Sequence, residues 1–113
     1  TNLRRSKLYV TSADGFVVNN NVYKIFYNDK DLGLTLKEFD LFKLLISNAG
    51  VTVPREELFA EVWGDDYMGE TRTLDMHIGT LRHKLGDEST APRYIKTVRG
   101  VGYRFLGEVE KEG

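Results

Sequence analysis

Cysteine is absent from the 113 residues of this chain. Its absence excludes a disulfide framework, a thiolate metal site and a cysteine nucleophile, and it fits a reducing compartment. The sequence also lacks any apolar stretch near the roughly 18 residues that a membrane span requires, and no secretory signal is visible. Because the chain begins with Thr1 rather than Met, we expect a fragment or a processed product that has lost a partner domain.

An excess of charge of one sign is lacking too, since 16 Lys and Arg residues stand against 17 Asp and Glu residues. The resulting net charge of −1 argues against a generally basic nucleic-acid binder. The basic residues are nevertheless concentrated, because residues 71–106 hold seven Lys and Arg against three Asp and Glu. A footprint on phosphates requires such a concentration, although a chance cluster of solvated charges would give the same pattern.

The first third of the chain consists of short β-prone segments, at residues 8–11, 16–18, 22–27 and 30–34. Gly, Asn and Asp residues separate these segments and favour tight turns. The pattern predicts an antiparallel meander of three or four strands. Its aromatic side chains are expected to pack on one face rather than to form a platform for stacked bases.

A first helix is predicted after the meander. Thr35 and Glu38 have the spacing of a capping box, in which each residue bonds the backbone amide of the other. The apolar stripe that follows should end near Asn48, with Gly50 as the C-terminal cap residue. At 113 residues the whole chain is expected to form one domain around this apolar stripe and its partners.

Two further helices are predicted between residues 54 and 85. Pro54 fits the first turn of the second helix, which Gly64 should end. Thr71 is expected to cap the third helix, residues 71–85. Its apolar positions fall on one helical face, at Leu74, Ile78, Leu81 and Leu85. The opposite face carries Arg72, Met76, Gly79, Thr80 and His83.

A β-hairpin is predicted over residues 93–106, with Arg99 at a tip to which Gly100 and Gly102 supply backbone freedom. An amphipathic helix followed by a basic hairpin favours DNA binding, with the helix in a groove and the hairpin on the neighbouring backbone or minor groove. The predicted fold is α+β: a winged helix-turn-helix with an N-terminal antiparallel β-sheet, three helices and a C-terminal β-hairpin wing. The domain is expected over residues 8–106, with 1–7 as a linker remnant and 107–113 as a flexible tail.

Three motifs carry a family resemblance. Residues 34–45 read L-T-x-x-E-F-x-L-F-x-x-L, residues 72–85 read R-T-L-D-x-H-I-x-x-L-R-x-K-L, and residues 97–105 read T-V-R-G-V-G-Y-R-F. Together with R-E-x-L at residues 55–58 and V-W-G at residues 62–64, they resemble the C-terminal effector domains of OmpR/PhoB-type response regulators of bacterial two-component systems. The resemblance covers about residues 8–106.

The resemblance implies a four-stranded N-terminal sheet, three helices and a wing, with helix 71–85 in the major groove and wing 95–106 on the minor groove or backbone. It implies sequence-specific promoter binding in the bacterial cytoplasm, by two domains on a direct repeat, under the control of an N-terminal receiver domain. It also implies a loop that contacts RNA polymerase, formed here by Asp65, Asp66, Tyr67 and Met68.

Two departures from the family pattern bear on DNA recognition. Many members carry a long polar residue where this chain has Gly79 and Thr80, which weakens any transfer of guanine-reading arginines. Pro54 stands where a serine usually caps the second helix, so the phosphate contact of that hydroxyl is not transferred. Gly79 also lowers helix propensity by about 1 kcal/mol relative to Ala, which close approach of the backbone to DNA would explain.

Nine residues are predicted to contact DNA: Arg72, Met76, Thr80, Arg82, His83, Lys84, Thr97, Arg99 and Tyr103. Arg82 and Lys84 are assigned to the phosphate backbone, and Arg99 is assigned to a narrow minor groove. Thr80 and His83 are assigned to a base edge or a phosphate.

Alternatives remain for several of these positions. Arg72 reaches a phosphate or a guanine edge, or pairs with Asp75 along the helix. Met76 touches a thymine methyl group, or packs under the preceding loop. His77 is expected to be a packed histidine rather than a reader of bases, and Trp63 is expected in the core.

Two other functions compete with DNA binding. A protein-interaction module on the same fold would use the wing or residues 64–70 to bind RNA polymerase or a partner domain. A small hydrolase or metal enzyme lacks support, because the sequence shows neither a nucleophile with its base nor metal-ligand spacing. We therefore predict no enzymatic activity, no cofactor and no metal.

Overall fold

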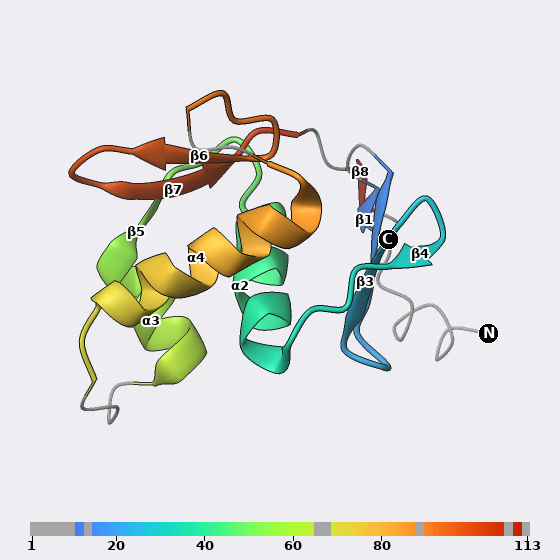
Figure 1. Ribbon diagram of the computed structural model, residues 1–113, viewed down its shortest axis with the longest axis horizontal. Helices are drawn as coiled ribbons and strands as arrows, with labels where there is room; N and C mark the ends of the chain where they lie inside the picture. Colours follow the sequence, from blue (N-terminus) through green and yellow to red (C-terminus); the bar gives the residue numbers. More distant parts are fainter. Residues whose placement is uncertain (1–10, 13–14, 65–68, 88–89, 108–109, 112–113) are drawn as a thin grey trace.

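The computed structural model describes residues 11–12, 15–64, 69–87, 90–107 and 110–111. Two three-stranded sheets flank the helices, one near each end of the chain (Figure 1). In the described part of the chain the elements follow the predicted order of meander, three helices and hairpin. The α+β winged helix-turn-helix that the sequence predicts is therefore confirmed.

The N-terminal sheet is an antiparallel meander of β2 (Phe16–Asn19), β3 (Lys24–Tyr27) and β4 (Lys30–Asp31). β3 begins two residues later than predicted because Tyr23 has a left-handed backbone, with φ of 56°, and belongs to the turn. The predicted four-stranded sheet is not found among the described residues. β1 (Thr11–Ser12) pairs instead with β8 (Glu110–Lys111), so a segment of the predicted C-terminal tail forms a short strand.

The domain boundaries themselves stay a prediction. The expected linker remnant, residues 1–7, lies outside the described residues. The pairing of β1 with β8 brings the backbone near the two ends of the domain together, through Thr11 opposite Lys111 and Ser12 opposite Glu110.

The first helix, α2 (Leu36–Ser47), has the predicted capping box. The Thr35 hydroxyl accepts from the amide of Glu38 at 3.3 Å, and the Glu38 carboxylate accepts from the amide of Thr35 at 2.9 Å. The helix ends at Ser47, close to the predicted end. Asn48, not the predicted Gly50, is the C-cap, because its amide bonds the last carbonyls of the helix; Gly50 lies in the following turn with φ of +82°. In Figure 1, α2 lies between the N-terminal sheet and α3, and α4 crosses in front of it.

The starts of the next two helices differ from the predictions. Pro54 belongs to the short strand β5 (Val53–Pro54) and is the N-cap of α3 (Arg55–Trp63), so it precedes the first turn rather than forming it. Its extended backbone, with ψ of 146°, allows it to join the strand. Thr71 precedes α4 (Arg72–Leu85) but makes no side-chain capping bond, because its backbone is already helical.

The hairpin is formed as predicted, by β6 (Ile95–Val98) and β7 (Gly102–Phe105). Its third strand was not predicted: β5 pairs with β7, with Val53 opposite Tyr103 and Pro54 opposite Gly102. A Cβ atom at Gly102 would overlap the carbonyl oxygen of Val53. Gly102 is therefore required for this close strand approach, and its role as a source of tip flexibility was wrongly predicted.

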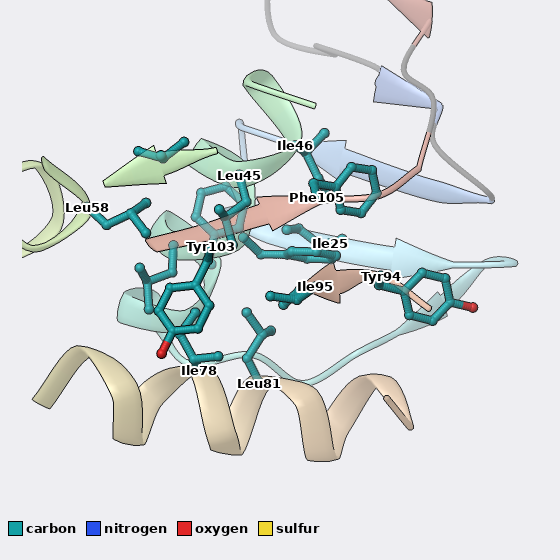
Figure 2. Packing of buried hydrophobic residues seen from close by; sticks show 14 of the residues in the cluster. Ile25, Leu45, Ile46, Leu58, Ile78, Leu81, Tyr94, Ile95, Tyr103 and Phe105 are labelled. Carbon is teal, nitrogen blue, oxygen red and sulfur yellow. The ribbon is translucent and has the colours of Figure 1, made fainter. Parts of the chain in front are cut away.

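The core lies between α4, α2 and the two sheets. Leu74, Ile78 and Leu81 of α4 are at most 1% exposed, and Ile78 and Leu81 point from the helix towards β7 and β6 (Figure 2). Phe16 of the N-terminal sheet meets Phe42 of α2 edge to face at 5.1 Å and Tyr94 at 5.0 Å between ring centroids. Phe16 thus packs into the core and Tyr27 packs against it partly buried, whereas Tyr23 is 61% exposed, so the meander aromatics do not all share one packed face as predicted. α4 is left with one outward face.

Candidate nucleic-acid interface

The outward face of α4 carries the residues that helical spacing predicts. Arg72, Met76, Gly79, Thr80 and His83 are all exposed, whereas the apolar face of the same helix is buried. Met76 has 66% of its surface exposed, so the alternative in which it packs under the preceding loop is wrong. The last turn contains three basic residues, Arg82, His83 and Lys84. Positive charge at this end of the helix interacts favourably with the negative end of the helix dipole.

Two of the predicted DNA contacts are engaged by Glu38 of α2. The Thr80 hydroxyl donates to its carboxylate at 2.6 Å, and the Lys84 ammonium donates at 2.7 Å. Lys84 also donates to the carbonyl of Gly33 at 3.0 Å. Since Glu38 is only 3% exposed and accepts the amide of Thr35 as well, this Glu38 cluster joins the start of α2 to the C-terminal half of α4.

The Glu38 cluster fixes the charge of its carboxylate. Burial alone would raise the pKa of Glu38, but the hydrogen bonds from Lys84, Thr80 and the Thr35 amide outweigh burial and lower the pKa below its usual value. Glu38 is therefore an anion at neutral pH, and the positive charge of Lys84 is partly neutralised by it. The sequence marked Glu38 only as a capping residue.

A second carboxylate, Asp75, joins α4 to both α3 and the wing. Arg55 of α3 donates to it through Nη2 at 2.6 Å and Nε at 3.3 Å, and the Tyr103 hydroxyl of β7 donates at 2.6 Å. The pairing of Arg72 with Asp75 is not formed. Arg72 lies 3.7 Å from Glu70 instead, in a contact exposed to solvent.

The Asp75 contacts shift two pKa values in opposite directions. Burial raises the pKa of Asp75, but the bonds from Arg55 and Tyr103 outweigh burial and lower it overall. Burial and the bond to the Asp75 anion raise the pKa of Tyr103 to about 12. The phenol of Tyr103, with 6% of the residue exposed, is thus held protonated inside the domain.

Arg82 joins α4 to the first wing strand. Its Nη2 donates to the carbonyl of Ile95 at 2.9 Å and to the hydroxyl of Thr97 at 2.8 Å. Its guanidinium also lies over the Tyr103 ring, 5.7 Å from the centroid. Its Nε is buried without a hydrogen-bond partner in the described part of the chain.

The wing tip presents Arg99 to solvent. No hydrogen bond or ion pair is formed by its side chain within the described residues, and the next residue, Gly100, turns the chain with φ of +78°. The inner side of the tip borders a hollow of about 360 Å³ that Arg99, Thr97 and Tyr103 share with Arg55 and Asp75. The wing tip and the first half of α4 therefore border one surface depression.

His77 and Trp63 pack as expected. The Nδ1 atom of His77 lies 2.9 Å from the Thr73 carbonyl, and its ring meets the Trp63 indole edge to face at 4.9 Å. Trp63 also stacks on Phe59 at 5.3 Å. These contacts connect α3 to the inner edge of α4 and leave both rings partly buried.

Asp87 was not identified from the sequence, where it lay in a predicted loop. It is 8% exposed and accepts the amides of Arg93, Tyr94 and Ile95, which fixes the start of β6. The predicted polymerase-contact residues Asp65, Asp66, Tyr67 and Met68 lie outside the described residues.

Within the ranges that the structure describes, no group of three or more His, Asp or Glu side chains is arranged to hold a metal ion. Among the same residues, none of the helices combines the length and apolar character needed to cross a membrane.

Comparison with known proteins adds independent evidence. A family described as "Transcriptional regulatory protein, C terminal" matches residues 29–105. The chain is 44% identical over 92 residues to the regulatory protein VanR of Enterococcus faecium, covering 80% of this chain and 40% of VanR. It is 44% identical over 80 residues to the sensory transduction protein RegX3 of Mycolicibacterium smegmatis, covering 71% of this chain and 35% of RegX3.

A solved structure is similar over most of the fold. The DNA-binding domain of Klebsiella pneumoniae RstA, in complex with the RstA box, superposes with a TM-score of 0.78 at 31% identity. The match covers 87% of this chain and 96% of that domain. The chain thus matches nearly the full length of the RstA DNA-binding domain, but it spans less than half the length of VanR or RegX3.

Proposed function

The chain belongs to the family of C-terminal domains of transcriptional regulatory proteins, of the OmpR/PhoB type, and from this premise we propose that it binds promoter DNA sequence-specifically. In this proposal it is the effector domain of a two-component regulator. Two observations carry the proposal: the outward face of α4 is exposed, and Arg99 is exposed at the wing tip, beside a hollow that Asp75 of α4 also borders. Positive charge is concentrated on residues 71–106, as binding to phosphates requires.

Within the predicted interface, some residues are proposed to contact DNA directly and others to position α4 and the wing. Arg72, Met76, His83, Thr97 and Arg99 are exposed, and α4 enters the major groove while the wing follows the backbone or minor groove. Thr97 touches DNA while its hydroxyl accepts from Arg82.

The other four predicted contacts are engaged within the protein, which supports a positioning role for them. Thr80 and Lys84 hold α4 against α2 through Glu38, whereas Arg82 and Tyr103 hold the wing against α4. Their direct contact with DNA stays a prediction.

The regulatory setting is proposed from the family. A receiver domain precedes this domain in the full-length protein, which acts in the bacterial cytoplasm and binds two direct-repeat half-sites as a dimer. Residues 65–68 contact RNA polymerase. The function requires no catalysis and no cofactor, because binding and positioning are sufficient.

Selection from a pool of random duplexes, at low salt and with sequencing of the bound fraction, tests the proposal. We expect enrichment of a half-site, and of a direct repeat spaced by about one helical turn when two domains bind. Specific binding should weaken steeply with added salt, because each phosphate contact releases counterions. An unenriched pool, with binding that disappears at moderate salt, would contradict sequence-specific recognition and would favour a protein-interaction module.

A further inference from the structure

The inference concerns Met76 and Gly79, which lie one helical turn apart on the outward face of α4. We propose that these two residues read an A·T-rich half-site by apolar contact with thymine methyl groups in the major groove. The inference rests on the proposed function, because it specifies the DNA that the same surface selects. Its evidence lies in how the exposed and the engaged side chains are distributed along α4.

Nothing in the described part of the protein requires a glycine at position 79. Its backbone is helical rather than left-handed, and a Cβ atom at this position would meet nothing within 4 Å. Glycine lowers helix stability relative to alanine, so the fold alone favours a side chain here. The missing side chain instead lets an external partner approach the helix backbone closely, as Gly102 lets Val53 approach β7.

Met76 supplies the apolar surface beside this gap. It is 66% exposed, the largest exposed fraction among the exposed large hydrophobic side chains of the described residues. Three residues along a helix correspond to a rise of about 4.5 Å and a rotation of about 60° between neighbouring positions on one face. The exposed thioether of Met76 and the uncovered backbone at Gly79 are therefore neighbouring parts of the groove-facing surface, and together they are called the notch.

Two polar side chains beside the notch, Thr80 and Asp75, are engaged within the protein and do not compete with it. The Thr80 hydroxyl is donated to Glu38 at 2.6 Å, and Asp75 is occupied by Arg55 and Tyr103. The middle of the outward face thus offers apolar surface instead of a forked donor for guanine. Among the groups at the major-groove edge of the base pairs, the thymine methyl is the apolar one. A narrow A·T-rich minor groove would also suit the exposed Arg99 of the wing.

Replacement of thymine by deoxyuridine tests the inference directly, because deoxyuridine keeps the base pair and removes only the methyl group. The duplex is the half-site recovered by selection, and each thymine is replaced in turn. For the wild-type chain we expect about a fourfold loss of affinity for each methyl that the notch contacts. Positions outside the notch should tolerate the replacement without loss.

Two variants connect the effect to the notch. Met76→Ala should bind the thymine and deoxyuridine duplexes with equal affinity, since the apolar partner is gone, and Met76→Leu should keep the discrimination. Gly79→Ala should unfold at a higher denaturant concentration than the wild type yet bind the half-site several-fold more weakly. Val22→Ala is the matched control, because it shortens an exposed apolar side chain in the turn between β2 and β3.

The outcomes distinguish failure of the thymine-methyl contact from failure of the proposed DNA binding. Unchanged wild-type affinity on deoxyuridine duplexes, or a discrimination that survives Met76→Ala, would overturn the thymine-methyl contact while leaving specific DNA binding intact. A Gly79→Ala domain that binds as tightly as the wild type would exclude close approach at that position. Absence of specific binding to the thymine duplex itself would refute the proposed function, and the inference with it.

Discussion

At the scale of single residues, Arg99 is an exposed member of the predicted DNA interface. It is exposed at the wing tip, and none of the bonds described for the protein engages it. Arg82, by contrast, donates hydrogen bonds from its guanidinium to Ile95 and Thr97 inside the domain. Two arginines only 17 positions apart therefore have different roles, which follow from their partners rather than from their charge.

Replacement of Arg99 by Ala should weaken specific binding by roughly tenfold without lowering the stability of the domain. The salt dependence of binding should also become shallower by about one phosphate contact. Titrations of the half-site at several salt concentrations measure both effects. Lys30→Ala, which removes an exposed charge from β4, is the control, and equal behaviour of the two variants would refute the wing contact.

Gly79 on α4 has room for a side chain, whereas Gly102 on β7 has none. Gly102→Ala should lower the free energy of unfolding by about 1–3 kcal/mol or more, because its Cβ would overlap the Val53 carbonyl oxygen and force β5 away from β7. Gly79→Ala is the matched control, expected to raise it by about 1 kcal/mol since nothing lies within 4 Å. Urea unfolding measures both, and a neutral Gly102→Ala would show that β5 yields easily.

At the scale of elements, two carboxylates determine how α4 sits. Glu38 joins it to the start of α2, and Asp75 joins it to α3 and to β7. Arg82 adds a further connection to β6. Because the wing and α4 are joined at these points, we infer that their relative position is set before DNA is bound, which reduces the ordering cost of binding.

Removal of the Tyr103 hydroxyl tests the connection between β7 and α4. Tyr103→Phe should cost about 1.5–3 kcal/mol of stability, the usual range for a hydrogen bond to a charged group. It should also weaken binding to the half-site, since the wing is less firmly held. Urea unfolding and DNA titration of the same preparation measure the two effects, and full retention of both would show that Arg55 and Arg82 suffice.

The alkaline side of the stability profile gives a second readout for Tyr103. Its pKa is raised from 10.0 to about 12 in the folded domain, so the folded state favours the protonated phenol. That stabilisation is complete below pH 10 and is lost as the pH rises towards about 12. The Tyr103→Phe variant should not lose stability in this alkaline range. A simple packing defect would not abolish this pH dependence.

At the scale of the whole molecule, the hydrogen-bonded carboxylates of Glu38 and Asp75 make the stability of the domain depend on pH. The pKa values of Glu38 and Asp75 are lowered from their ordinary 4.5 and 3.8, so the folded state favours both anions. Their stabilisation is present above these ordinary values and is lost as the pH falls through the lowered ones. The domain should therefore lose stability progressively as the pH falls from about 5.

A Glu38→Gln variant identifies the contribution of one carboxylate to this acid loss. The amide cannot pair with Lys84 as an anion does, so the variant should be less stable than the wild type at neutral pH by about 1–3 kcal/mol. Its stability should also fall less steeply with acid. Urea midpoints measured between pH 7 and pH 3 provide the comparison, and parallel curves for the two proteins would contradict the assigned role of Glu38.

The sequence by itself determined the elements and the outward face of α4. Helical spacing separates Leu74, Ile78 and Leu81 from Met76 and His83, and the structure buries the first set and exposes the second. The capping box at Thr35 and the hairpin formed by β6 and β7 were also predicted from the sequence. These features depend on contacts between residues close in the chain, whose geometry is fixed by helix and strand periodicity.

Only the tertiary structure decided which polar groups are left free to reach DNA. Glu38 meets Thr80 across 42 positions of sequence, and Tyr103 meets Asp75 across 28. The pairing of β5 with β7 and of β1 with β8 is likewise non-local. No local pattern encodes such partners, because a side chain's free donors depend on which distant segments pack beside it. The sequence therefore predicted nine residues at one interface, and the fold engages Thr80, Arg82, Lys84, Thr97 and Tyr103 in hydrogen bonds within the protein.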